Sequence, residues 1–209
     1  GFERDSRAAV LHRYDDGAGL TKVGRDRDDA LGAVVVADCL DGVQQQVEDH
    51  LLQLDPVGLD QALADPGRKD QSSADARRKP RELVAFAGVK PGDKVLDLIP
   101  GSGYWTRIFS KVVGPRGKVY AVWPQAYARE AMGNVADLRK MSADRYYGNI
   151  VTEVQPSTSL TAPEPLDVVW TSQNFHDYPD EFMGKGDPSQ LAKDAFKILK
   201  PGGSVVMPS

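Results

Sequence analysis

Residues 94–113 read KVLDLIPGSGYWTRIFSKVV, a short apolar segment that runs through two glycines into an amphipathic segment. The pattern predicts a strand at 94–98 and a helix after the glycines, because apolar residues then recur at i, i+3, i+4 and i+7. The apolar helix face consists of Trp105, Ile108, Phe109 and Val112. A strand, a tight turn and a helix form the first unit of an open parallel α/β sheet, which binds ligands at the carboxyl ends of its strands.

The turn between these elements is Pro100-Gly101-Ser102-Gly103. Glycine has no Cβ, so a ligand can approach the backbone at Gly101 and Gly103 closely. Unbonded amides at the start of the helix favour an electronegative ligand group. The alternative is an ordinary strand-to-helix turn, since two glycines after a strand are a weak signal.

Composition excludes several classes of function. The 209 residues carry a formal net charge of −4 without a dominant basic patch, so nucleic acid is not indicated as a partner. Cys39 is the only cysteine, which excludes an internal disulfide and a cysteine-based zinc site, and no other metal site is indicated. No apolar run reaches the roughly 20 residues that span a bilayer. The default expectation is a cytoplasmic protein, with an upstream leader left open because the chain begins at Gly1.

The first 60 residues differ from the rest. They hold 11 Asp and 2 Glu against 5 Arg and 1 Lys. Residues 1–30 show no sustained period and are expected to be loop or disordered; a strand is expected near 31–37 and a helix over 41–54. We therefore predict an acidic, partly disordered extension at 1–60 and an α/β domain at 61–209.

A polar segment with Pro66-Gly67, residues 62–73, has the composition of a linker. Pro80 then suits the first turn of a helix that ends at Gly88. The basic run Arg77-Arg78-Lys79 before it is either a solvated helix start or a source of one arginine that reaches over the ligand pocket.

Strands and helices alternate through the remaining chain. Strands are expected at 118–122, 149–154, 166–172 and 204–207, and helices over 126–141 and from 188 to 200. Alternation of this kind predicts a doubly wound, mostly parallel sheet that is covered by helices on both faces.

Three segments in this order, VLDLIPGSGY, LDVVW and LKPGGSVVM, resemble motifs of the class I S-adenosylmethionine-dependent methyltransferases. The wording is most similar to a branch of uncharacterised predicted methyltransferases with a DLIPG-x-GY-x-TR signature, a Q-N-x-H-D segment and an R-K-P motif. The resemblance covers about residues 61–209. It implies a Rossmann-like fold and S-adenosyl-L-methionine as the cofactor, with its amino acid end at the glycine turn.

The resemblance also implies cofactor-binding residues. Asp97 would orient the methionine ammonium group, although it is also placed to cap the turn by accepting backbone amides. The cofactor-binding set is Asp97, Ile99, Pro100, Gly101, Ser102, Gly103, Trp123, Gln173 and Asn174.

Two positions depart from the family pattern. Ile99 stands where the pattern D-x-G-x-G-x-G has its first glycine. After the second strand, where an acidic residue usually holds the ribose hydroxyls, this chain has Trp123-Pro124-Gln125. Either Trp123 stacks on the adenine or Gln125 replaces the carboxylate.

Candidate catalytic groups follow the fourth strand, in SQNFHDYPD at 172–180. His176 is the expected general base, since its unperturbed pKa is near 6.5, and Asp177 would orient it or act as the base itself. The alternative is that both residues only cap the following loop. Tyr104, Trp105, Tyr146, Tyr147 and Tyr178 are further candidates for the pocket, or ordinary packing residues.

The family normally continues beyond the fifth strand with a helix and a hairpin of two strands. The chain ends at Ser209, so we expect a fragment whose fifth strand leaves an unpaired edge. The leading functional interpretation is methyl transfer to a small-molecule acceptor. A non-catalytic module that binds a ligand or a partner protein is the alternative, and the oligomeric state is not indicated. A nicotinamide-dependent oxidoreductase is disfavoured because Gly101 and Gly103 are followed by Thr106 rather than a third glycine.

Overall fold

A computed structural model describes residues 8–12 and 56–208. The expected strand at 31–37 and helix over 41–54 lie outside the described residues. Ala8–His12 forms strand β1 and pairs antiparallel with the last strand, which corrects the expectation of loop or disorder there.

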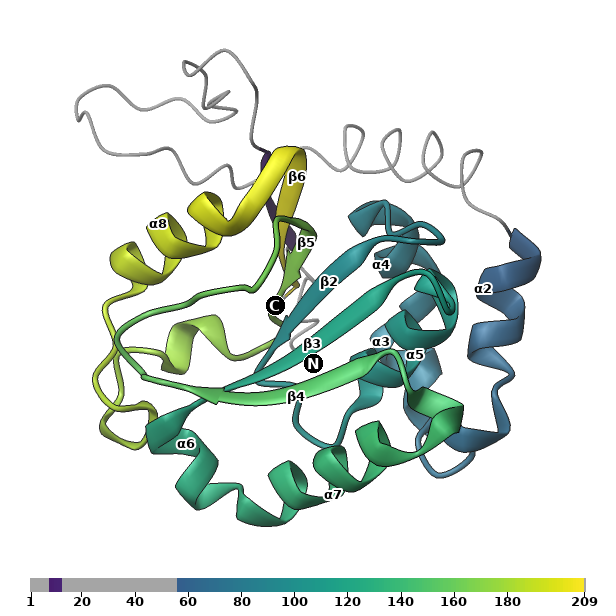
Figure 1. Cartoon of the computed structure of the whole chain (residues 1–209), viewed down its shortest axis with the longest axis horizontal. Helices are drawn as coiled ribbons and strands as arrows, with labels where there is room; N and C mark the ends of the chain where they lie inside the picture. Colours follow the sequence, from purple (N-terminus) through teal and green to yellow (C-terminus); the bar gives the residue numbers. More distant parts are fainter. Residues whose placement is uncertain (1–7, 13–55, 209) are drawn as a thin grey trace, which may run out of the picture.

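One six-stranded sheet organises the described chain, in the order β1-β6-β5-β2-β3-β4 (Figure 1). The parallel strands are β2 (Lys94–Leu98), β3 (Lys118–Pro124), β4 (Ile150–Gln155), β5 (Leu166–Trp170) and β6 (Leu199–Pro208). The predicted parallel α/β fold is therefore confirmed, and all five strands end at the same edge of the sheet. The expected unpaired edge is wrong for β6, because β1 covers it from His12 to Ala8.

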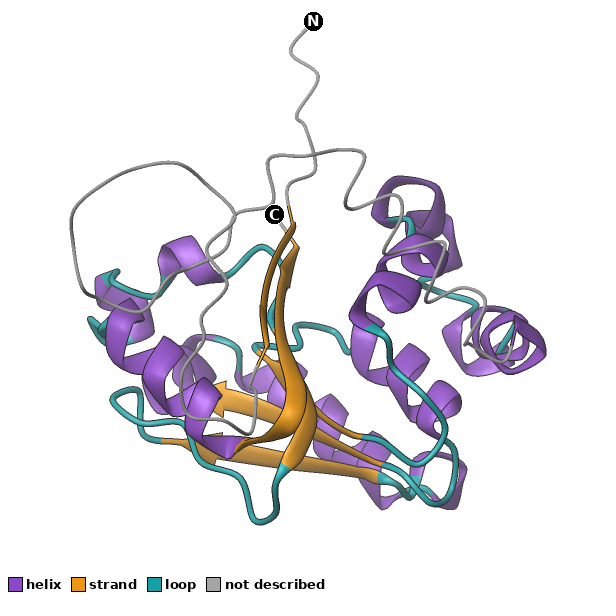
Figure 2. Cartoon of the chain, turned by 90° about the horizontal axis from the view of Figure 1, so that it is seen from above, coloured by secondary structure: helices purple, strands orange, loops and turns teal. Residues whose placement is uncertain are grey.

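Helices flank both sides of the sheet (Figure 2). They are α2 (Pro56–Leu63), α3 (Asp75–Arg78), α4 (Pro80–Ala87), α5 (Tyr104–Val113), α6 (Gln125–Glu130), α7 (Met132–Ala143) and α8 (Pro188–Ile198). Short 3₁₀ turns are η1 (Pro66–Arg68), η2 (Ser72–Ala74), η3 (Arg145–Tyr147), η4 (Phe175–Asp177) and η5 (Glu181–Met183). The single helix expected over 126–141 is two helices that meet at Ala131.

Local signals explain several boundaries. Pro80 is the first residue of α4, and Gly88 ends it in the left-handed region at φ 65°. Asp187 caps α8 by accepting the Ser189 amide at 2.8 Å.

The Leu-Lys-Pro-Gly-Gly motif is part of β6 rather than a turn before it. A Cβ at Gly203 would lie 3.0 Å from the carbonyl oxygens of Leu166 and Asp167, so glycine lets β6 approach β5 closely. Lys200 then pairs with the Asp167 carboxylate at 2.8 Å. The motif therefore fixes the pairing of the two strands.

An aromatic cluster joins α5 to the sheet. The Trp105 ring lies 4.7 Å from Trp170 and 6.1 Å from Phe109, and all three side chains are buried. Ring contacts of this kind add to the free energy gained by burial of apolar area. The cluster holds the start of α5, and with it the glycine turn, in a fixed position against β2 and β5.

Candidate functional site

The glycine turn contains three left-handed residues, Ile99 at φ 59°, Gly101 at φ 58° and Gly103 at φ 80°. A Cβ at Gly101 would meet nothing within 4 Å, whereas a Cβ at Gly103 would lie 2.8 Å from Cδ2 of Leu138. The expectation of a close ligand approach therefore fits Gly101 alone. Gly103 is needed for packing against α7.

Ile99 shows why the family pattern has glycine at this position. A β-branched residue at positive φ is strained, and the surrounding structure must hold it there. The Ile99 side chain is 5% exposed and belongs to the core. Asn174 donates from Nδ2 to the carbonyl oxygen of Ile99 at 3.2 Å and to that of Ser172 at 2.7 Å. Asn174, predicted as a cofactor residue, thus links the β5 loop to the turn.

Asp97 is buried at the end of β2. Its side chain is 1% exposed, and Oδ2 accepts a hydrogen bond from Oγ1 of Thr106 at 2.6 Å. Burial raises the pKa of Asp97 to about 7, although hydrogen bonds from Thr106 and the charge of Arg78 lower it. Of the two interpretations of Asp97, this geometry matches the cap on the start of α5.

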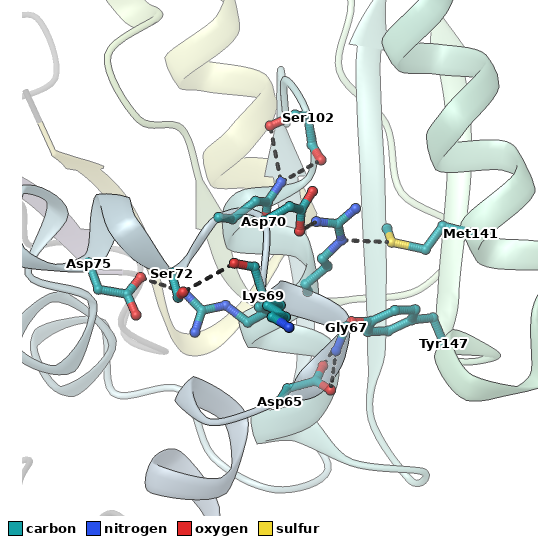
Figure 3. Close-up of polar contacts among 12 residues, drawn as sticks. Asp65, Gly67, Lys69, Asp70, Ser72, Asp75, Ser102, Met141 and Tyr147 are labelled. Carbon is teal, nitrogen blue, oxygen red and sulfur yellow. Dashed lines mark hydrogen bonds and ion pairs between the residues drawn. The ribbon is translucent and has the colours of Figure 1, made fainter.

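Residues 65–75, which we call the bracing segment, lie against the glycine turn and α5 (Figure 3). Gln71 donates from Nε2 to the Ser102 carbonyl oxygen at 3.0 Å and to its Oγ at 3.1 Å. Arg107 on α5 pairs with Asp70 at 3.3 Å. The linker expected at 62–73 is wrong, because this segment is part of the packed domain.

A buried ion pair anchors the bracing segment. Arg68 is fully buried; it donates to Asp75 Oδ1 at 2.6 Å and to the Leu63 carbonyl oxygen at 2.7 Å. The Tyr104 hydroxyl donates to the same Asp75 oxygen at 2.6 Å. Tyr104 is therefore a packing residue. The sequence gave no signal for this cluster, since its members are far apart and lie in a segment with loop composition.

The two tyrosines near the start of β4 also bind the bracing segment. Tyr146 and Tyr147 both donate hydroxyl hydrogen bonds to Asp65, at 2.8 Å in the case of Tyr147. Burial acts to raise the pKa of Asp65, but these two hydrogen bonds outweigh it and hold the pKa below its usual value. The suggested aromatic acceptor site at these tyrosines is not formed.

Trp123 does not offer a stacking surface for adenine. Its side chain is fully buried in the core, with its ring 5.8 Å from Tyr127. Gln125 follows at the carboxyl end of β3 and is exposed. Of the two replacements considered for the ribose-binding acid, only Gln125 is accessible.

The segment after β5 crosses the carboxyl edge of the sheet toward α6. Gln173 has φ 62° and donates its amide to the Pro208 carbonyl oxygen at 3.0 Å. His176 is 75% exposed, and its Nε2 lies 3.1 Å from Asp177 Oδ1. Further on, Phe182 contacts the Tyr127 ring at 5.7 Å. The predicted acid–base pair is thus formed and open to an acceptor.

A cavity of about 260 Å³ lies next to this segment. Tyr178, two residues after His176, lines it and donates its hydroxyl to the Ser157 carbonyl oxygen at 3.0 Å. The other lining residues are Thr158, Ser159, Leu160, Lys185, Asp187, Gln190, Leu191 and Asp194. This mixture of polar and apolar groups suits a small ligand.

Two further classes of site were searched for in the described residues. Among them, no cluster of three or more His, Cys, Asp or Glu side chains is arranged to bind a metal ion. None of the helices in the described ranges has the length and apolar character needed to span a membrane.

Comparisons with known proteins agree with the fold. A SAM-dependent methyltransferase from Aquifex aeolicus matches with a TM-score of 0.51 at 22% identity, over 74% of this chain and 72% of that one. A protein-L-isoaspartate O-methyltransferase of Hyperthermus butylicus is 28% identical over 129 residues, or 60% of this chain and 48% of the relative. The ubiquinone/menaquinone biosynthesis C-methyltransferase UbiE of Hydrogenovibrio crunogenus is 27% identical over 128 residues, or 61% and 46%.

The chain therefore spans about half the length of the curated relatives it matches. The model of the protein-L-isoaspartate(D-aspartate) O-methyltransferase family matches residues 72–209, from the bracing segment to the end of β6. Because this match covers more than half of the chain and includes the strand, the open glycine and the loop after β5, the protein belongs to that methyltransferase family.

Proposed function

We propose that the protein transfers the methyl group of S-adenosylmethionine to a small-molecule acceptor at the carboxyl edge of the sheet. The observation that carries the proposal is the open backbone at Gly101, in a strand–turn–helix unit that the methyltransferase family model covers. The exposed amide of Gln125 is placed for the ribose hydroxyls. The chain's residues thus fit the cofactor at both ends.

The cofactor supplies an electrophilic methyl group on a sulfonium centre. The protein's part is to align the acceptor in line with that methyl group and to exclude water. We assign the removal of a proton from an acceptor hydroxyl or amine to His176, with Asp177 holding the imidazole at 3.1 Å. The cavity of about 260 Å³ beside Tyr178 supports a small acceptor.

A carboxylate on a protein is the second candidate acceptor. It is favoured by the family description and by the Hyperthermus relative, which is a protein-L-isoaspartate O-methyltransferase. The UbiE relative favours a small molecule instead.

Calorimetric titration with S-adenosylhomocysteine and with NAD tests the cofactor. Binding of the first alone supports the proposal, and binding of neither supports the non-catalytic alternative. Transfer of labelled methyl groups to a set of small phenols, quinols and amines, against a peptide that contains isoaspartate, then decides the acceptor class.

The assignment of His176 has its own test. His176→Ala should lower kcat on the order of 100-fold or more, the usual contribution of a general base, while leaving the affinity for S-adenosylhomocysteine unchanged. An unchanged kcat would remove His176 from the mechanism, and transfer to a carbon or to an ionised carboxylate would not need it.

A further inference from the structure

Arg78, the last residue of α3, lies beside the glycine turn with its hydrogen-bonding groups unused. Its guanidinium carbon is 4.6 Å from the centre of the Tyr104 ring, and Tyr104 directly follows Gly103. The side chain is half-buried. Stacking on an aromatic ring fixes the plane of a guanidinium without using its N–H donors.

A second arginine on the same ring gives the contrast. Arg68 lies 5.2 Å from the Tyr104 centre, and its terminal nitrogens are bonded to Asp75 and to the Leu63 carbonyl oxygen. Arg78 has no hydrogen bond or ion pair with any residue that the structure describes, and its Nε is enclosed without a partner. Arg68 is therefore structural, whereas Arg78 is held in place with its donors available.

The nearby carboxylates do not satisfy Arg78. Asp75 is paired with Arg68, and Asp97 is buried against Thr106. The charge of Arg78 nevertheless reaches Asp97, whose pKa it lowers. A fixed guanidinium with free donors matches the planar, two-oxygen shape of a carboxylate.

We propose that Arg78 binds the carboxylate of the methionine moiety when S-adenosylmethionine occupies the turn. The inference rests on the proposed function. That carboxylate is the cofactor's only anionic group, since the adenosine is neutral and the sulfonium and ammonium are positive. Residues 99–103 and Arg78 lie on either side of Tyr104 in contact terms, so that the amino acid end at the open backbone of Gly101 is within the reach of Arg78.

An unpaired acceptor on the bracing segment has the complementary polarity. Gln71 uses its Nε2 on Ser102 of the glycine turn, while its Oε1 is enclosed and has no hydrogen-bond partner among the described residues. An acceptor suits the ammonium group as a donor fork suits the carboxylate. Both halves of an amino acid thus have a matching group in residues 71–78.

The test compares two ligands that differ in the amino acid moiety. S-adenosylhomocysteine carries the carboxylate, and 5′-methylthioadenosine keeps the nucleoside and thioether but lacks the amino acid. Their affinities are measured by calorimetry for the wild-type chain, Arg78→Met, Arg78→Lys and Arg77→Met. Arg77 is the matched control, because it is the exposed neighbour in the same helix.

Arg78→Met should weaken S-adenosylhomocysteine on the order of 10- to 100-fold, as expected when charge-assisted hydrogen bonds are lost, and should leave 5′-methylthioadenosine unchanged. Arg78→Lys should lie between the two, since it keeps the charge and loses the fork, and Arg77→Met should bind both ligands like the wild type. Equal weakening of both ligands, or no weakening of S-adenosylhomocysteine, would overturn the inference. Failure of the wild-type chain to bind either ligand would instead count against the proposed function.

Discussion

Gly101 and Gly103 show how two residues with the same backbone conformation serve different ends. Both have positive φ, but only Gly101 faces open space, and Gly103 faces the Leu138 side chain. Sequence alone does not separate them, because the motif specifies the conformation and the neighbouring helix decides what lies above each Cα. Substitutions at the two positions should therefore separate ligand binding from folding.

Gly103→Ala should destabilise the chain by more than Gly101→Ala. Both variants carry the left-handed strain of about 1–2 kcal/mol, and the alanine at 103 also meets Leu138 Cδ2. Gly101→Ala should instead weaken S-adenosylhomocysteine. Urea unfolding and calorimetry on both variants measure the two effects, and Leu138→Ala combined with Gly103→Ala should recover part of the lost stability. Equal stability of the two single variants would contradict the assignment.

Asp97 predicts a pH dependence of stability. Its pKa of about 7 in the folded state lies above the value of 3.8 expected without burial. The folded state therefore binds the proton more tightly, and the contribution to stability is full below pH 3.8 and is lost as the pH rises through 7. The loss amounts to at most about 1.4 kcal/mol per pH unit.

Asp97→Asn removes this titration and tests it. The difference in unfolding free energy between variant and wild type should change in the variant's favour from pH 5 to pH 8, in urea titrations at each pH. Parallel curves over that range would show that the carboxyl group is not perturbed. The comparison with the variant is needed because Asp65, with a lowered pKa, has the opposite effect: its contribution is present at high pH and lost on acidification.

The bracing segment is the element that the sequence misjudged. Residues 62–73 are polar and contain Pro66-Gly67, which is the composition of a linker. In the fold the segment is tied down by its side chains, through Asp65 to the two tyrosines and through Arg68 to Asp75. Long-range hydrogen bonds of this type leave no periodic signal.

Removal of Arg68 measures how much the segment depends on its buried ion pair. Arg68→Met should cost on the order of 3 kcal/mol, because Asp75 loses its charged partner and the Leu63 carbonyl its donor. Arg81→Met is the control: it removes an ion pair with Asp60 in which both side chains are exposed, and should cost under about 1 kcal/mol. Thermal and urea unfolding compare the two, and similar losses would show that burial does not distinguish these pairs.

At the scale of the whole molecule, one sheet connects the two ends of the described chain. β1, at 8–12, pairs along β6 from Ser204 to Pro208, and the strand order places this pair at the side opposite β4 (Figure 1). The pairing supplies the backbone partners of the outer edge of β6. An uncovered edge of that length is a template for association between copies.

Removal of residues 1–12 should therefore promote self-association. Light scattering after gel filtration should show a mass that rises with protein concentration for the shortened chain, and less so for the intact chain at the same concentrations. A shortened chain that stays monomeric throughout would show that the edge of β6 is protected by other means.

The sequence by itself determined the parallel α/β fold, the strand–glycine–helix unit and most helix boundaries. These features depend on local rules: apolar periodicity, proline at a helix start and glycine at a positive φ act within a few residues of the chain. The acid–base pair of His176 and Asp177 belongs here too, because its members are adjacent.

Only the tertiary structure decided which candidates are open to a ligand. Trp123 is buried, Gln125 is exposed, Asp97 faces Thr106, and Arg78 lies on Tyr104 with its donors free. Each of these facts depends on which distant residue fills the space beside a side chain. That space is set by the packing of the bracing segment, α7 and the loop after β5 around the sheet, which no local pattern encodes.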